Sequence, residues 1–141
     1  MQQILTLCIG NICRSPLAEA LLVREFPGRT IWSAGLSAMV GEPAHAMSMA
    51  LAAEQGLDLS AHRAQQVTSQ MCQRADLILV MEQHQRAALE RRYPLVRGKV
   101  FCLGAKDIAD PFRLPRPAFE TAYADIARGV ADWAVRIRQL G

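Results

Sequence analysis

The chain has 141 residues, of which 51% are hydrophobic and 21% are charged, a size and balance that suit one globular domain over residues 1–141. No apolar run approaches the roughly 18 residues that a membrane-spanning helix needs, and the N-terminus lacks the basic region of a signal peptide. We therefore expect a cytoplasmic protein without membrane insertion. The formal net charge is only +3, and the chain has no basic stripe of the kind that binds nucleic acid.

The cysteines and histidines do not predict a metal site. There are four cysteines and three histidines, but no two cysteines form a CxxC pair and the histidines do not complete a zinc-binding spacing. Structural disulfides are not expected in a cytosolic chain of this kind. We expect no metal and no other cofactor.

The first half of the chain predicts two short strands and two helices. In chain order these are a buried strand over residues 4–7, a helix over 17–26, a strand over 30–33 and a helix over 44–55. Ser15 is a good N-cap and Pro16 a good first residue for the first helix. Gly56 follows the second helix at the position where glycine commonly ends helices. Residues 36–43 and 57–67 are expected to be loops.

The second half predicts two more strands and three helices. Thr68 can cap a short helix that ends at Arg74. Residues 75–81 contain Leu-Ile-Leu-Val, the most continuous strand signal in the chain. A helix over 83–93, a strand over 99–103, a proline-bearing loop over 104–117 and a closing helix over 119–140 follow. Loops as long as 104–117 are often functional.

Strands that alternate with helices predict an α/β fold. We expect an open four-stranded parallel sheet with helices on both faces, of Rossmann-like type. Ligands bind such sheets beyond the carboxyl ends of the strands. Cys8 and Ser33 lie at two of these ends, and the 104–117 loop leaves a third, so all three are expected at the same edge.

Residues 8–16, Cys-Ile-Gly-Asn-Ile-Cys-Arg-Ser-Pro, carry the strongest chemical signal. They join a strand to a helix through a tight loop, so backbone amides and the helix N-terminus converge on one point. Such a cradle fits a doubly charged tetrahedral anion and stabilises a thiolate, which makes Cys8 a nucleophile. Arg14 adds a planar, two-pronged donor for phosphate-type oxygens. The pattern predicts covalent transfer of a phosphate group.

A second residue must protonate the oxygen that leaves when a phosphate ester is cleaved. Asp107 and Asp110 both lie in the 104–117 loop. Pro111 biases Asp110 toward an extended conformation, which favours Asp110. An Asp-Pro pair is also common in ordinary turns, and the pair alone does not exclude that alternative.

Residues 7–16 together with Asp110-Pro111-Phe112 resemble the low-molecular-weight protein-tyrosine phosphatases. The resemblance covers nearly the whole chain and includes Ser33-Ala34-Gly35, residues 60–64 around His62, and residues 75–81. The order of the parts also matches, with the nucleophile near the N-terminus and the acid far downstream. The fold that this family implies is the phosphotyrosine phosphatase I type of parallel α/β sheet.

The resemblance implies that Cys8, Arg14 and Asp110 are the catalytic residues. Cys8 is expected to attack phosphorus and form a phosphocysteine, Arg14 to bind the phosphate oxygens, and Asp110 to protonate the phenol and then activate water. Ser15 is expected to hydrogen-bond the sulfur. No metal is required. The expected phosphate-binding segment comprises Ile9, Gly10, Asn11, Ile12, Cys13, Arg14 and Ser15.

Two further loop residues have expected supporting roles. Asn11 suits the left-handed turn that such a loop requires, and the resemblance implies that partners matching Ser33 and His62 hold it. Cys13 matches a second loop cysteine present in many relatives. It is either a small packing residue or a redox partner that captures a sulfenic acid on Cys8 as a reversible disulfide.

The residues expected at the rim of the site indicate which substrate it prefers. Phe112 is expected to flank the phenyl ring of phosphotyrosine, with Leu36 and Met39 on the facing wall. The aliphatic loop from Leu36 is similar to that of the bacterial subgroup encoded with exopolysaccharide tyrosine kinases. The expected partner is therefore a phosphotyrosine protein, a cognate bacterial tyrosine kinase, in exopolysaccharide or capsule production. We expect a monomer that binds no nucleic acid.

Two other functions are compatible with an anion cradle. Thioredoxin-coupled arsenate reductases need two further cysteines, beginning after the third strand, but no cysteine lies between Cys72 and Cys102. A non-catalytic phosphotyrosine-binding module would not need Cys8, Arg14 and Asp110 together. Both alternatives are disfavoured.

Overall fold

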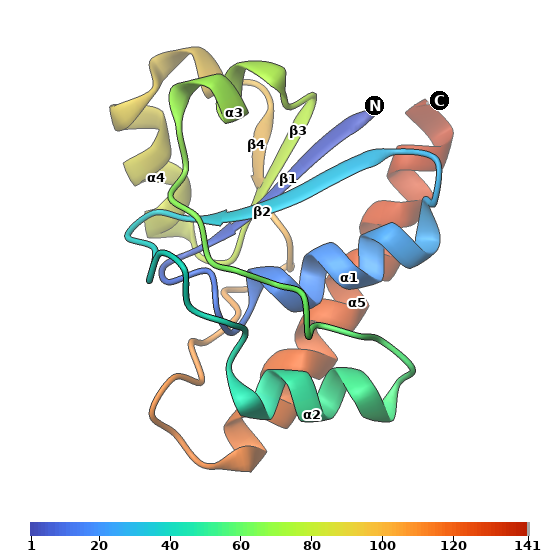
Figure 1. Cartoon of the computed structure of the whole chain (residues 1–141). Helices are drawn as coiled ribbons and strands as arrows, with labels where there is room; N and C mark the ends of the chain where they lie inside the picture. Colours follow the sequence, from blue (N-terminus) through green and yellow to red (C-terminus); the bar gives the residue numbers. More distant parts are fainter. Residues whose placement is uncertain (141) are drawn as a thin grey trace.

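The predicted parallel α/β fold is confirmed by the computed structural model, which describes residues 1–140 (Figure 1). Within these residues, four strands form one parallel sheet in the order β2-β1-β3-β4. The elements in chain order are β1 (Gln3–Cys8), α1 (Ser15–Glu25), β2 (Thr30–Gly35), α2 (Ala46–Glu54), α3 (Ser69–Arg74), β3 (Leu77–Val80), α4 (Gln83–Arg92), the 3-10 turn η1 (Pro94–Val96), β4 (Val100–Cys102) and α5 (Arg116–Leu140).

Helices cover both faces of the sheet, as the continuous apolar strands predict. Ile4 of β1 packs with residues of α1 and α5 on one face, whereas Leu5 and Leu7 pack with residues of α3 and α4 on the other. Figure 1 shows α1 and α5 together on one side of the strands, with α2 beside α5, and α3 and α4 on the opposite side. No helix in the described part of the chain is both long and apolar enough to cross a bilayer.

The carboxyl ends of the strands meet at one edge of the sheet. β1 leads there into residues 9–14, β2 into residues 36–45, and β4 into the loop before α5. Gly35, at the end of β2, lies so close to the first of these segments that a Cβ atom would stand 2.5 Å from the Ile9 carbonyl oxygen. Only glycine permits this approach.

Most predicted boundaries are within two residues of those observed, and the differences have local causes. Ser15 was expected to be the N-cap of α1, but Arg14 occupies that position, because the Ser15 hydroxyl contacts Cys8 and Asn11 instead. The closing helix begins at Arg116, three residues earlier than expected, with Pro117 in its first turn, where the missing amide hydrogen is tolerated. The predicted Thr68 cap is confirmed, because its hydroxyl accepts a hydrogen bond from the Met71 amide at 3.2 Å.

Candidate active site

The loop between β1 and α1 turns its carbonyl groups outward. Each carbonyl oxygen from Cys8 to Cys13 accepts a hydrogen bond of 2.7–3.0 Å from a group outside the loop. In a trans peptide, the carbonyl of one residue and the amide of the next point in opposite directions, and the chain has no cis peptide in its described part. The six amides of residues 9–14 therefore face the interior of the loop. The donors to the six carbonyls are, in order, Leu36 N, Ser37 N, Met39 N, His62 Nε2, His45 N and Ser48 Oγ.

Asn11 fixes the turn of this loop. Its φ is +60°, the left-handed region in which asparagine is tolerated, and its side chain is fully buried. Its Nδ2 donates to Ser15 Oγ at 2.8 Å and to Ser33 Oγ at 3.0 Å, and its Oδ1 accepts from the Gln65 amide at 2.9 Å. His62 Nε2 lies 2.7 Å from the Asn11 carbonyl oxygen. Since a carbonyl can only accept, Nε2 carries the proton.

Cys8 lies at the base of the loop with 2% of its surface exposed. Its Sγ is 3.0 Å from Ser15 Oγ. Because Asn11 Nδ2 already donates to that hydroxyl, the hydroxyl's own hydrogen is left to donate to the sulfur. The inward amides and this hydroxyl are the groups that stabilise a thiolate.

Cys13 lines the same cavity as Cys8 but has a different environment. Burial raises the pKa of its thiol to about 12, negative charge on Cys8 and Asp110 adds to the rise, and Arg14 opposes it. Cys13 is therefore a neutral thiol at physiological pH.

Arg14 is 1% exposed and is held from one side. Its Nη1 donates to Glu82 Oε1 and to the Ile108 carbonyl oxygen, both at 2.6 Å. Its Nε has no partner among the described residues, and its Nη2 makes only a 3.7 Å contact with Asp110 Oδ2. Two donors of the planar guanidinium are thus available for a two-pronged contact with an oxyanion.

The structure separates the two candidate acids. Asp110 lines a cavity of about 120 Å³ together with Cys8, Cys13 and Arg14, and its side chain is 43% exposed. Asp107 does not line this cavity. Its Oδ1 instead accepts from the Gln83 amide at 3.0 Å, at the start of α4.

Two of the three residues predicted at the rim, Leu36, Met39 and Phe112, line the cavity. Met39 and Phe112 line the cavity, and Ser37 joins them. Leu36 does not line it, because its side chain packs against the core cluster under α3 and α4. Ser33 and His62 both reach Asn11, as predicted.

Three residues that the sequence did not single out complete the site. Glu82 pairs with Arg14, Gln65 donates its amide to Asn11 Oδ1, and Glu19 accepts a 2.5 Å hydrogen bond from Ser33 Oγ. Glu82 directly follows β3 at the carboxyl edge of the sheet. In the sequence, the only sign of its role was a charged residue directly after a buried strand.

Comparisons with known proteins agree with this geometry. The family model described as low molecular weight phosphotyrosine protein phosphatase matches residues 3–140. The probable low molecular weight protein-tyrosine-phosphatase EpsP of Ralstonia nicotianae is 49% identical over 144 residues, covering 100% of this chain and 99% of the relative.

Solved structures of the same fold extend the comparison. Vibrio vulnificus Wzb in complex with benzylphosphonate has a TM-score of 0.91 and 41% identity, over 95% of this chain and 97% of that one. The YwlE arginine phosphatase from Geobacillus stearothermophilus has a TM-score of 0.92 but only 29% identity, over 99% and 94% of the two chains. The chain therefore belongs to the low molecular weight phosphotyrosine protein phosphatase family.

Proposed function

We propose that this protein, acting as a single-domain monomer, hydrolyses phosphotyrosine on proteins through a phosphocysteine intermediate and without a metal ion. The observation that carries the proposal is the ring of six inward amides and Arg14 around Cys8, with Asp110 at the mouth of the cavity. These groups supply fixed positive charge where the phosphate oxygens would lie. Family membership over residues 3–140 supports the same reaction.

The first step transfers the phosphoryl group to the enzyme. The Cys8 thiolate attacks phosphorus, the bond from phosphorus to the tyrosine oxygen breaks, and Asp110 gives its proton to the departing phenolate. Arg14 and the loop amides bind the three equatorial oxygens. Glu82 and the Ile108 carbonyl hold Arg14 in orientation through Nη1.

The second step releases phosphate. The Asp110 carboxylate takes a proton from water, whose oxygen attacks phosphorus as the bond from sulfur to phosphorus breaks. Cys8 leaves as a thiolate, and the Ser15 hydroxyl, whose Oγ lies 3.0 Å from the sulfur, donates its hydrogen to stabilise the charge.

The proposed substrate is a phosphotyrosine protein because Cys8 is buried below the rim. A phenyl ring carries the phosphate deeper than the short serine side chain does, and Phe112 and Met39 can contact the ring. We further propose that the partner is a bacterial tyrosine kinase of exopolysaccharide or capsule production. The resemblance of the aliphatic rim loop and the similarity to proteins named EpsP and Wzb support it.

Aryl phosphates with graded leaving groups, assayed with a chelator present, test the reaction. We expect Cys8→Ser to abolish turnover. Asp110→Asn should lose about 10²- to 10⁴-fold on poor leaving groups, the usual contribution of a general acid, and much less on good ones, which need little protonation. Activity that survives Cys8→Ser, or that requires added metal, would contradict the mechanism.

Matched phosphopeptides test the substrate class. A peptide from such a kinase should be hydrolysed when it carries phosphotyrosine. The same peptide with phosphoserine, and a phosphoarginine peptide, should not. Preferred hydrolysis of phosphoarginine would assign the chain the activity that YwlE is named for.

A further inference from the structure

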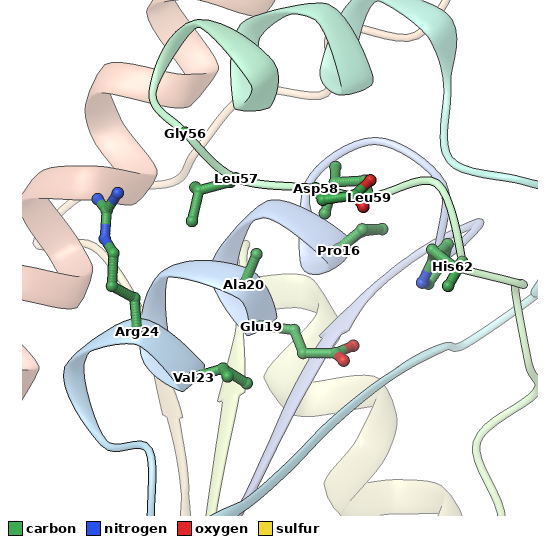
Figure 2. A pocket seen from close by; sticks show the side chains of 11 residues that line it. Pro16, Glu19, Ala20, Val23, Arg24, Gly56, Leu57, Asp58, Leu59 and His62 are labelled. Atoms are coloured by element: carbon green, nitrogen blue, oxygen red, sulfur yellow. The ribbon is translucent and has the colours of Figure 1, made fainter.

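A second and larger cavity, of about 520 Å³, lies between α1 and residues 56–62 (Figure 2). Its volume falls within the range of small-molecule sites. It shares no residue with the cavity that contains Cys8. Apolar side chains form most of its walls, among them Pro16, Ala20, Val23, Leu57 and Leu59.

The charged groups of this cavity are unevenly placed. Figure 2 shows the carboxylates of Glu19 and Asp58 on the same side as His62, with Arg24 at the far end. Hydrogen bonds from Ser60 hold the pKa of Asp58 below its usual value, so Asp58 carries its negative charge at neutral pH. Arg24 is already engaged, because its Nη1 donates to the Gln55 carbonyl oxygen at 2.9 Å.

We propose that this cavity binds a small organic cation, an ammonium or guanidinium group on an apolar body. The cationic group lies between Glu19 and Asp58, and the body lies on the apolar walls. Charge complementarity sets the orientation, since Arg24 repels a cation at the opposite end.

A chain of hydrogen bonds links the wall of this cavity to the nucleophile. Glu19 Oε1 accepts from Ser33 Oγ at 2.5 Å, and Ser33 Oγ accepts from Asn11 Nδ2 at 3.0 Å. The same Nδ2 donates to Ser15 Oγ, which contacts Cys8 Sγ. A second link runs through His62, which lines the cavity and donates to the Asn11 carbonyl.

The sign of the coupling follows from charge. The Glu19 carboxylate repels a dianion in the phosphate loop, and a cation bound beside Glu19 offsets that repulsion. Cation and phosphate should therefore bind with positive cooperativity. By linkage, each must tighten the other by the same factor.

Calorimetric titration with n-hexylammonium chloride tests the site without any assay of hydrolysis. We expect saturable binding by the wild type, and none with hexanol, which lacks the charge, or hexanoate, which reverses it. Val23→Trp fills the cavity from a side chain that is 45% exposed and should abolish binding. Val135→Trp, at a 55% exposed position of α5 outside the cavity, is the matched control and should bind as the wild type does. Asp58→Asn should weaken binding about fivefold, the effect of one exposed charge pair near contact distance.

The same titration in saturating inorganic phosphate, at constant ionic strength, tests the coupling. We expect the Kd of hexylammonium to fall about fivefold, the lower end of typical couplings between sites. No saturable binding by the wild type, or equal Kd values for the wild type and Val23→Trp, would overturn the site. An unchanged Kd in phosphate would overturn the coupling.

Discussion

Asn11 stabilises the phosphate loop through two separable effects, and a pair of substitutions distinguishes them. Its side chain makes three hydrogen bonds to Ser15, Ser33 and Gln65, and its backbone has a φ of +60°. Asn11→Ala removes the hydrogen bonds and places alanine in the left-handed region. Asn11→Gly removes the same hydrogen bonds but tolerates the conformation.

The number of lost hydrogen bonds and the left-handed backbone together give the expected size of each effect. A protein hydrogen bond contributes a net of about 0.5–1.5 kcal/mol, so losing three should lower the free energy of unfolding by about 1.5–4.5 kcal/mol in both variants. The left-handed conformation costs alanine about 1–2 kcal/mol more. Asn11→Gly should therefore be about 1 kcal/mol more stable than Asn11→Ala, after allowing for the greater freedom of unfolded glycine. The kcat values of the two should be similarly reduced, because both release Ser15.

Urea denaturation and turnover of an aryl phosphate provide the two measurements. Arg113 is the control, because it is exposed and has a φ of +67° without a comparable buried network. Arg113→Gly should exceed Arg113→Ala in stability by a similar margin, with kcat little changed in either. Equal stability of the two Asn11 variants would refute the cost assigned to a left-handed alanine. A loss of unfolding free energy below about 0.5 kcal/mol in both variants would refute the contribution assigned to the three hydrogen bonds.

Three other substitutions test the surroundings of the nucleophile. Glu82→Gln keeps the shape of the Arg14 partner but removes its charge. We expect kcat to fall about tenfold, equivalent to about 1.4 kcal/mol of lost orientation. An unchanged kcat would show that the charge of Glu82 is not needed to orient Arg14. Gly35→Ala places a Cβ 2.5 Å from the Ile9 carbonyl oxygen and should lower kcat. Gly28→Ala is the control, because its Cβ would have no other atom within 4 Å, and it should leave kcat unchanged. Equal kcat values for the two variants would contradict the close approach of Gly35 to Ile9. The wild-type enzyme should recover its activity with a dithiol after inactivation by peroxide, and Cys13→Ser should not. Equal recovery of the two proteins would show that Cys13 does not protect Cys8 from oxidation.

The parts of the site that are local in sequence could be predicted from it. Cys8, Asn11, Arg14 and Ser15 lie within eight consecutive positions, so the strand, the turn and the helix start fix their relative placement. The continuous apolar runs of the central strands likewise predicted a sheet buried on both faces, since each run packs against helices on two sides.

The contacts that orient the loop could not be predicted in the same way. Glu82 reaches Arg14 from 68 positions away, and the Gln65 amide reaches Asn11 from 54. No periodicity encodes such contacts, because they depend on which strand ends become neighbours. Long-range contacts also explain why Ser15 is not the N-cap of α1, although its residue type suits that position. Its hydroxyl is used for Cys8 and Asn11, so tertiary contacts overrode the local preference.

The charge state of Cys8 affects the reactivity of Cys13. Burial is the largest cause of the raised pKa of Cys13, and negative charge on Cys8 adds to it, so Cys13 stays protonated and out of the phosphoryl-transfer reaction. In the predicted redox role of Cys13, we expect peroxide to convert Cys8 to a neutral sulfenic acid with release of hydroxide. That change should remove the repulsion from Cys8, so that a Cys13 thiolate attacks the Cys8 sulfur and forms a disulfide as hydroxide leaves. Burial, the largest cause of the raised pKa, remains in the oxidised state. Disulfide formation should therefore accelerate as pH rises, a dependence that a purely structural Cys13 would not produce.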